Sequence, residues 1–288
     1  MLPKPIYNLY KSSLLRRLFL PVLSKLNPGD IHIRHHYTGR RFLIHSFQHK
    51  GYWFHGKRRE KETMAFFEQV VRKGDTVLEV GGHVGYLTVF FDQLVGVSGS
   101  VVVFEPGKNN SKYIHANTRD LPSVEIVRNA ISNTNGIAAF FEESLTGQNN
   151  SLIGDYKVFQ ENRARAYSSA EYRHRKIKTV RLDTFCHERK LRPDVIKIDI
   201  EGAEFMALEG GVQMLAESKP LLMVEVTRQA EQVFNFLSRH GYQLFSPEGK
   251  QVSAPNCIRG NLCAVHPDNH RDRLHGSVWA NGCMLSAG

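Results

Sequence analysis

Three ionisable residues occupy alternate positions in an otherwise apolar stretch, V-I-K-I-D-I-E-G-A-E, at residues 195–204. Lys197, Asp199 and Glu201 therefore share one side of a predicted strand as it emerges from the sheet. Buried charges are costly unless they pair or take part in chemistry. A carboxylate here can act as a general base, or the pair Asp199 and Glu201 can anchor a divalent cation. The structural alternatives are that Lys197 only neutralises Asp199, and that Glu201 and Glu204 only favour a positive helix N-terminus.

A second segment, starting at Gly74, reads G-D-T-V-L-E-V-G-G-H-V-G-Y and joins a predicted strand to a helix through a glycine-rich turn. The turn's glycines, Gly81, Gly82 and Gly85, allow tight turning and close approach of the backbone to a ligand. The pattern is not the dinucleotide fingerprint G-x-G-x-x-G, because Val80 stands two positions before Gly82. It is not a P-loop either, because no Gly-Lys-Ser/Thr follows. Glu79 inside the strand would repel phosphate, but it suits a cofactor that carries an amino group and a sulfonium. His83 in this turn is either a base or a spacer.

Two further polar residues follow the next predicted strands. Glu105 ends V-V-V-F about 20 residues beyond Gly85, where a carboxylate can accept two hydrogen bonds from a ribose diol. Asn129 follows V-E-I-V-R and is a candidate for contacting an adenine, although asparagine is common at strand ends. With the glycine turn, these residues indicate an adenosine-cofactor site at one edge of a parallel sheet.

The elements that must position these residues alternate between strands and helices. Strands that are apolar throughout, such as V-V-V-F and P-L-L-M-V-E-V, favour a sheet buried on both faces. We therefore predict an α/β fold with a doubly wound, mostly parallel sheet. The expected strands lie near 76–80, 101–105, 124–129, 195–200 and 220–226, with later strands near 242–246 and 261–266 closing the sheet edge.

We expect three parts along the chain. Residues 1–58 form an N-terminal extension, with a basic amphipathic helix and a short strand pair around Thr38-Gly39. Residues 59–267 form the main domain, with an insertion at about 136–182 that caps the strand ends. Residues 268–288 are polar and form a flexible tail.

The composition indicates the kind of environment in which the protein works, but it does not identify a partner. The 288 residues carry a net charge of +10, which favours anionic surroundings such as nucleic acid, acidic lipid or phosphorylated substrates, unless the charge only solvates loops. The four cysteines lack CxxC spacing, and the histidines lack ligand neighbours, so we predict reduced thiols, no metal site built from cysteine or histidine, and a cytoplasmic location. Residues 1–28 mix basic and apolar residues, which suits either peripheral membrane contact or docking on protein.

Several segments together resemble FkbM-type S-adenosylmethionine-dependent methyltransferases, over roughly residues 60–250. They are V-L-E-V-G-G-H-V-G-Y, V-V-V-F-E-P, N-A-I-S-N-T-N-G, N-N-S-L and, most specifically, I-K-I-D-I-E-G-A-E. The sequence departs from the usual pattern with Glu79 in place of a commoner Asp and Gly82 in place of a commoner Ala. Both departures keep the chemistry of the position.

The resemblance implies a seven-stranded, Rossmann-like class I methyltransferase fold. It also implies methylation of a hydroxyl on a sugar, glycolipid or secondary metabolite, with S-adenosylmethionine as the cofactor. By motif, the glycines would flank the methionine moiety above Glu79, with Tyr86 as a further cofactor contact. Glu105 would hold the ribose, Asn129 would lie near the adenine, and Asp199 would face the transferred methyl group.

Two other functions remain open at this point. A nucleic-acid methyltransferase is suggested by the charge and by the Arg/Lys/Tyr-rich residues 163–178, but D-I-E-G replaces the Asn/Asp-Pro-Pro-aromatic segment that suits flat amine acceptors. A non-catalytic cofactor-binding or membrane-docked scaffold is the other, because fold does not guarantee activity.

Overall fold

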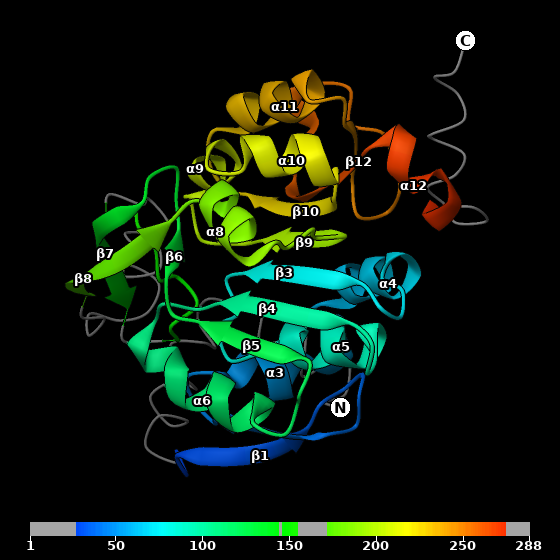
Figure 1. The fold of residues 1–288 in the computed structure, drawn as a ribbon. Coiled ribbons are helices and arrows are strands. Elements are labelled where there is room, and N and C mark those ends of the chain that lie inside the picture. Colours follow the sequence, from blue (N-terminus) through cyan, green and yellow to red (C-terminus); the bar gives the residue numbers. More distant parts are fainter. Residues whose placement is uncertain (1–26, 144–145, 155–171, 275–288) are drawn as a thin grey trace. The chain divides into compact units, whose positions relative to one another are not determined.

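The computed structural model describes residues 27–143, 146–154 and 172–274, which divide into two compact units, Met1–Lys61 and Glu62–Gly288 (Figure 1). Most of the amphipathic stretch expected in residues 1–28, and part of the basic run 163–178, lie outside the described residues. Within those residues, no helix has the length and apolarity needed to cross a bilayer.

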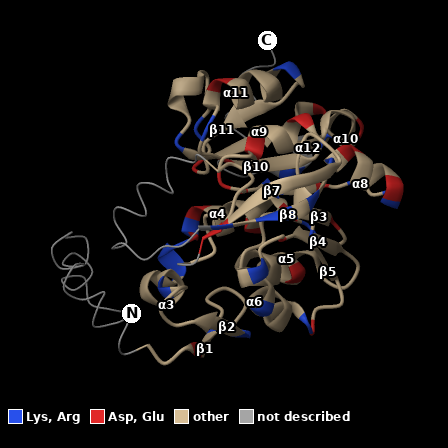
Figure 2. Ribbon diagram, turned by 90° about the vertical axis from the view of Figure 1, so that its left-hand side faces the viewer, with Lys and Arg blue, Asp and Glu red and all other residues tan. Residues whose placement is uncertain are grey.

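The first unit contains the strand pair expected from the sequence. Strands β1 (Asp30–Arg34) and β2 (Arg41–His45) pair antiparallel and are followed by α3 (Lys50–His55) and the 3-10 turn η1 (Gly56–Arg58). Alternation places Ile31 and Ile33 opposite the fully buried Ile44 and Phe42, so one face of the hairpin is apolar. Figure 2 colours the Lys and Arg residues in the described part of this unit, from residue 27 onward, blue.

The second unit is built on a seven-stranded sheet with the order β11-β12-β10-β9-β3-β4-β5 (Figure 1). Neighbouring strands from β10 to β5 are parallel, and β12 is antiparallel to both of its neighbours. The predicted doubly wound, mostly parallel α/β fold is therefore confirmed. The strands are β3 (Thr76–Val80), β4 (Ser100–Phe104), β5 (Val124–Val127), β9 (Val195–Ile198), β10 (Leu221–Val226), β11 (Gln243–Phe245) and β12 (Gly260–Val265).

Helices cover both faces of this sheet. Leu78 and Val80 belong to a buried cluster with Phe185 and Leu215 of α8 and α10, whereas Glu79 on the opposite face contacts Thr88 of α5. The helical elements are α4 (Lys61–Val70), α5 (Tyr86–Val95), α6 (Lys108–Thr118), α8 (Leu182–Arg189), α9 (Glu204–Glu209), α10 (Val212–Ser218), α11 (Ala230–Arg239) and the short η2 (Pro255–Cys257). Because α5 meets Glu79, this residue faces a helix rather than the apolar α8–α10 layer.

A separate three-stranded sheet occupies the region where the sequence predicted a capping insertion. It consists of β6 (Ala130–Ile131), β8 (Tyr172–Val180) and β7 (Gly136–Glu143), in that order. The loop after β7 returns to pair Ser151 with Phe141. The Ser151 hydroxyl also donates a hydrogen bond of 2.8 Å to the carbonyl oxygen of Glu201. The loop therefore reaches the segment that follows β9.

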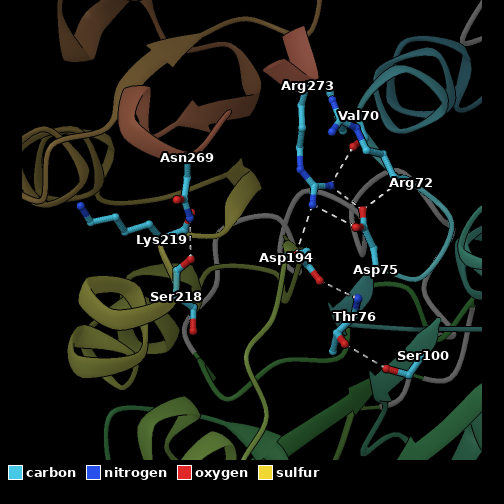
Figure 3. Close-up of polar contacts among 10 residues, drawn as sticks. All are labelled: Val70, Arg72, Asp75, Thr76, Ser100, Asp194, Ser218, Lys219, Asn269 and Arg273. Atoms are coloured by element: carbon cyan, nitrogen blue, oxygen red, sulfur yellow. Dashed lines mark hydrogen bonds and ion pairs between the residues drawn. The ribbon is translucent and has the colours of Figure 1, made fainter. Parts of the chain in front are cut away.

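The segment assigned from the sequence to a flexible tail begins with a helix, α12 (Pro267–Leu274). The guanidinium of Arg273 pairs with the carboxylates of Asp75 and Asp194 and donates a hydrogen bond to the Val70 carbonyl (Figure 3). Asn269 adds a hydrogen bond of 3.0 Å to the Ser218 carbonyl. Polar contacts therefore hold this helix to the amino ends of β3 and β9.

Candidate active site

The residues that follow the ends of the parallel strands lie in one row. Val80 aligns with Phe104 and with Ile198, and Ile198 aligns with Val224. Parallel strands in register end at the same edge of a sheet, where ligands of open α/β folds bind. The next residue on each strand forms what we call the strand-end row: Gly81, Glu105, Asp199 and Glu225.

The glycine turn is packed too closely for side chains. A Cβ on Gly81 would lie 1.9 Å from the Asp199 carbonyl oxygen, and one on Gly82 would lie 2.2 Å from a methyl carbon of Val103. Gly81 also has a φ of 98°, which favours glycine. Gly85 and the buried Tyr86 then begin α5. The turn therefore lies directly against the residue that follows β9.

Glu79, Lys197 and Asp199 form a charged group on one face of the sheet. Glu79 and Lys197 are aligned on neighbouring strands, and both are almost fully buried. The Lys197 ammonium lies 2.6 Å from the Asp199 carboxylate, and the Thr88 hydroxyl donates a 2.6 Å hydrogen bond to Glu79. Burial raises the pKa of Glu79 to about 8, against the opposing effects of Lys197 and Thr88. Glu79 is therefore largely protonated at neutral pH.

The exposed part of the group is Asp199, whose side chain is 31% accessible. Burial alone would raise the pKa of Asp199, but the Lys197 ammonium outweighs it and holds this pKa well below its usual value. The charge of Asp199, together with burial, raises the pKa of the adjacent Glu225 far above its usual range. At neutral pH the pair therefore consists of an ionised Asp199 and a protonated Glu225.

Asp199, Glu201 and Glu225 each place a carboxylate oxygen within 4.8 Å of the other two. Three clustered oxygens are ligands of the kind that Mg²⁺ and Ca²⁺ prefer. Lys197 already supplies a positive charge to Asp199, however, so this cluster does not by itself assign a metal.

Two glutamates after β9 differ in their surroundings. Glu201 has a φ of 55°, an unusual backbone conformation for a residue with a side chain, and its carbonyl accepts the bond from Ser151. The buried Glu204 accepts hydrogen bonds from the main-chain N–H groups of Ile200 and Gly202, at 3.2 and 2.8 Å. Glu204 therefore supports the turn that precedes α9, a structural role that differs from the helix N-terminus interaction considered from the sequence.

Glu105 is held at the centre of a second polar group. Its carboxylate accepts hydrogen bonds from the main-chain N–H groups of His83 and Gly107, both at 2.7 Å, and from the Asn110 amide at 3.2 Å. Burial raises the pKa of Glu105 to about 7, although these donors oppose the increase. A carboxylate has about four acceptor positions, so one remains for a further donor such as a ribose hydroxyl.

Loop contacts extend this group over the glycine turn. A ring nitrogen of His83 lies 3.0 Å from the Thr146 carbonyl oxygen, and the Asn110 amide donates to the Gly147 carbonyl. Asn129 lies further along the same edge, between β5 and β6, and is half-buried. The predicted residues of the turn, the strand-end row and Asn129 thus fall along the carboxyl edge of one sheet.

Four residues at this edge were not among those predicted to form the site: Lys197, Asn110, Ser151 and Glu225. Lys197 and Glu225 were visible as charges in apolar strands. Asn110 and Ser151 act through contacts with residues 37 and 50 positions away, which no local pattern encodes.

A separate cavity of about 540 Å³ lies at the opposite ends of β4 and β5. Its charged lining groups, Arg189 and Glu125, pair with each other at 2.5 Å. That mutual pairing leaves the carboxyl edge as the stronger candidate for chemistry.

Comparison with solved structures gives matches of low sequence identity. A methyltransferase FkbM from Methylobacillus flagellatus KT is 14% identical, with a TM-score of 0.43 over 66% of this chain and 43% of that chain. Aeropyrum pernix fibrillarin with natively bound S-adenosyl-L-methionine is 11% identical, with a TM-score of 0.38 over 83% of each chain. A SAM-dependent methyltransferase from Aquifex aeolicus is 13% identical, with a TM-score of 0.36 over 73% of this chain and 91% of that chain.

No curated protein sequence matches the chain significantly. The chain spans less than half of the Methylobacillus flagellatus structure, so a match to part of a protein is all that this comparison provides. The profile of the methyltransferase FkbM domain, in contrast, matches residues 79–244, which is more than half of the chain and includes the glycine turn and the whole strand-end row. The chain therefore belongs to the FkbM methyltransferase family.

Proposed function

We propose that this protein uses S-adenosylmethionine to methylate a hydroxyl group on a sugar, glycolipid or secondary metabolite. The observation that carries the proposal is the accessible, ionised Asp199 beside the glycine turn, within the region that matches the family. An accessible carboxylate next to a cofactor turn is suited to receive an alcohol and orient it.

The acceptor groups at the carboxyl edge fit a cationic adenosine cofactor. Glu105 has room for a ribose hydroxyl, and Asn129 is the candidate for contacting the adenine. The methionine moiety would lie along the glycine turn, from Gly81 to Tyr86, with Glu79 beneath it. When bound, S-adenosylmethionine supplies an electrophilic methyl group on a positively charged sulfur. The surplus of carboxyl groups around one lysine suits that positive charge.

Asp199 and Glu201 are the two candidates for activating the acceptor. An alcohol is a weak nucleophile and benefits from a base as its proton leaves. Because Lys197 holds Asp199 ionised, Asp199 is a weak base and a good hydrogen-bond acceptor. Asp199 would therefore orient the hydroxyl, with proton removal by Asp199 or by Glu201. Anchoring of a divalent cation by these residues is the alternative, and loss of activity in EDTA with recovery in Mg²⁺ would favour it.

Calorimetric titration with S-adenosylmethionine tests the cofactor assignment. We expect a dissociation constant on the order of micromolar for the unmodified protein, with binding lost in Glu105→Ala. Glu125→Ala, which removes a carboxylate from the opposite part of the sheet, is the matched control and should bind normally. Absence of binding to correctly folded protein would favour the scaffold function, and the residue roles above would be abandoned.

A nucleic-acid acceptor has one specific observation in its favour. Arg173, Lys176 and Lys178 are exposed on β8, in the region that follows the capping loop. Binding to RNA that weakens steeply with salt, and that is lost when Lys176 and Lys178 are replaced by Glu, would support this second candidate. Salt-independent methylation of a glycan hydroxyl would exclude it.

A further inference from the structure

The net positive charge of the chain is confined to its first compact unit. Residues Met1–Lys61 contain 13 Lys and Arg against 2 Asp and Glu, whereas residues 62–288 contain 25 against 26. The first unit therefore carries a net charge of +11, and the methyltransferase unit carries −1. A charge segregated in this way creates a local field that a uniformly distributed charge would not.

The β1–β2 hairpin concentrates part of this charge on its outer face. Arg34 and Arg41 are direct cross-strand partners, and both are exposed, as is the neighbouring Arg40. Like charges directly opposite each other on paired strands destabilise the pair. A bound anion between them would remove that repulsion.

The α3–η1 segment adds an aromatic residue to more basic ones. Trp53 is 38% exposed, and its indole N–H donates a 2.7 Å hydrogen bond to the Ser46 carbonyl. Lys57 and Arg58 follow it and are exposed. Of the two acidic residues in the unit, Glu60 forms an ion pair with Arg59 at 3.4 Å, so that its charge is compensated by this cation.

We propose that this first unit docks the protein on a membrane surface rich in anionic phospholipid. Exposed arginines and lysines attract lipid phosphates, and a tryptophan whose N–H is satisfied can place its ring at the headgroup level. The preceding residues 1–26 contain five Lys and Arg and no acid, interspersed with large apolar residues. A nucleic acid would use the charge and stack on the aromatic ring, whereas a lipid surface also uses the aliphatic side chains that accompany the basic residues in the sequence. The inference does not depend on the proposed activity.

Vesicle sedimentation of the full chain tests the charge requirement. We expect binding to phosphatidylcholine vesicles that contain phosphatidylserine and little binding to phosphatidylcholine alone. The triple variant Arg34→Glu, Arg40→Glu, Arg41→Glu should bind at least about 100-fold more weakly, because each basic residue near the surface contributes about a fivefold effect and the added glutamates are repelled. The control Arg173→Glu, Lys176→Glu, Lys178→Glu makes the same change of net charge in the second unit and should bind within about threefold of the unmodified protein. Equal weakening by both triple variants would overturn the proposal.

Trp53 provides a reporter within the unit. The chain has two tryptophans, so Trp279→Phe leaves Trp53 as the sole emitter. On addition of the anionic vesicles, its emission should shift to shorter wavelength and be quenched by brominated lipid. Vesicle binding without any change in Trp53 emission would assign the contact elsewhere and overturn the proposal. Tighter binding to single-stranded RNA than to the vesicles would replace it with a nucleic-acid surface.

Discussion

At the amino ends of β3 and β9, the buried Asp75 and the partly exposed Asp194 share a guanidinium, and at the carboxyl ends of the same strands several acids share one ammonium. Arg273 reaches both Asp75 and Asp194 at the first site (Figure 3). Main-chain N–H groups of Arg72 and Thr76 complete the hydrogen bonding of these two acids, at 2.8 and 2.9 Å. Charge and hydrogen bonding are satisfied there by the protein itself.

At the carboxyl ends, the protein's own cations and hydrogen-bond donors do not fully compensate the acidic groups. Lys197 is the cation closest to Glu79 and Asp199 in the described residues, and the pKa values of Glu79 and Glu105 are raised because burial is not fully offset. Groups with perturbed pKa values in an open edge of a sheet are characteristic of functional sites. The comparison indicates that the amino ends stabilise the fold and that the carboxyl ends are arranged for a ligand that brings its own positive charge.

The difference between the two ends of the strands is tested most directly at Asp199. Asp199→Asn keeps the size of the side chain and removes its charge, so we expect methyl transfer to fall about 100-fold to 10,000-fold, the usual contribution of a general base. Asp194→Asn, at the other end of the same strand, should leave turnover nearly unchanged and lower the stability instead. Rates of S-adenosylhomocysteine formation and thermal melting measure the two effects. Full turnover in Asp199→Asn with normal cofactor affinity would remove Asp199 from the mechanism.

At the amino ends the expected effect is on stability. Arg273→Met leaves the buried carboxylate of Asp75 and the partly exposed one of Asp194 without their cation and should lower the free energy of unfolding by about 3 kcal/mol. For a unit of this size the Tm should fall by roughly 6–12 °C. Lys219→Met is the matched control, because Lys219 also contacts α12, through Asp268 at 2.8 Å, but on the surface, where such pairs contribute less than about 1 kcal/mol. Equal losses in the two variants would mean that burial does not distinguish these contacts.

The two ends also differ in how far the sequence predicted them. Glu79, Glu105 and Asp199 were predictable because each lies in or just after a strand whose apolar pattern is strong, and parallel strands end together. The pairing of Lys197 with Asp199 was foreseen as an alternative, since the two alternate on one strand. Arg273 was not foreseen, because it lies 198 residues from Asp75 in a polar segment without periodicity.

The loop contacts at the carboxyl edge were equally unpredictable from the sequence. The sequence placed a capping insertion at about 136–182, but it contained no signal that Ser151 would bond the Glu201 carbonyl or that Asn110 would bridge Glu105 and Gly147. Such contacts depend on where a loop folds back in three dimensions, and local propensity carries no information on that. Sequence patterns predicted the candidate site residues, and tertiary contacts determine how each of these groups is held.

The charge of the ligand provides a further test of the carboxyl ends. Because Glu79 and Glu105 have raised pKa values, of about 8 and about 7, a cationic ligand should favour their ionised forms and release protons on binding. The affinity for S-adenosylmethionine should therefore increase by up to about tenfold between about pH 6 and pH 8.5. S-adenosylhomocysteine lacks the sulfonium charge and should show a smaller increase. Calorimetry in buffers of different ionisation enthalpy measures the proton release.

The same carboxyl groups affect the ligand-free protein in the opposite direction. A carboxyl whose pKa is raised on folding stabilises the protein below its unfolded pKa, and that contribution is lost as the pH rises through about 7 and 8. Glu79→Gln should therefore reduce the pH dependence of the Tm, and it should reduce the difference in pH dependence between the affinities for the two ligands. Asp75→Asn should leave that difference between the ligands intact. Identical pH dependence for the two ligands would show that the carboxyl edge does not sense the sulfonium.

The smallest expected effect comes from the hydrogen bond that supports Glu201. Its backbone is held at a φ of 55°, and the Ser151 hydroxyl is the side-chain donor to its carbonyl. Ser151→Ala removes about 1 kcal/mol of support, so kcat should fall about fivefold with little change in cofactor affinity. Ser123→Ala removes a hydroxyl that bonds Asp92 near the amino end of β5 and should leave kcat unchanged. If Ser151→Ala also leaves kcat unchanged, the conformation of Glu201 is not needed for turnover, and Asp199 alone must account for activation of the acceptor.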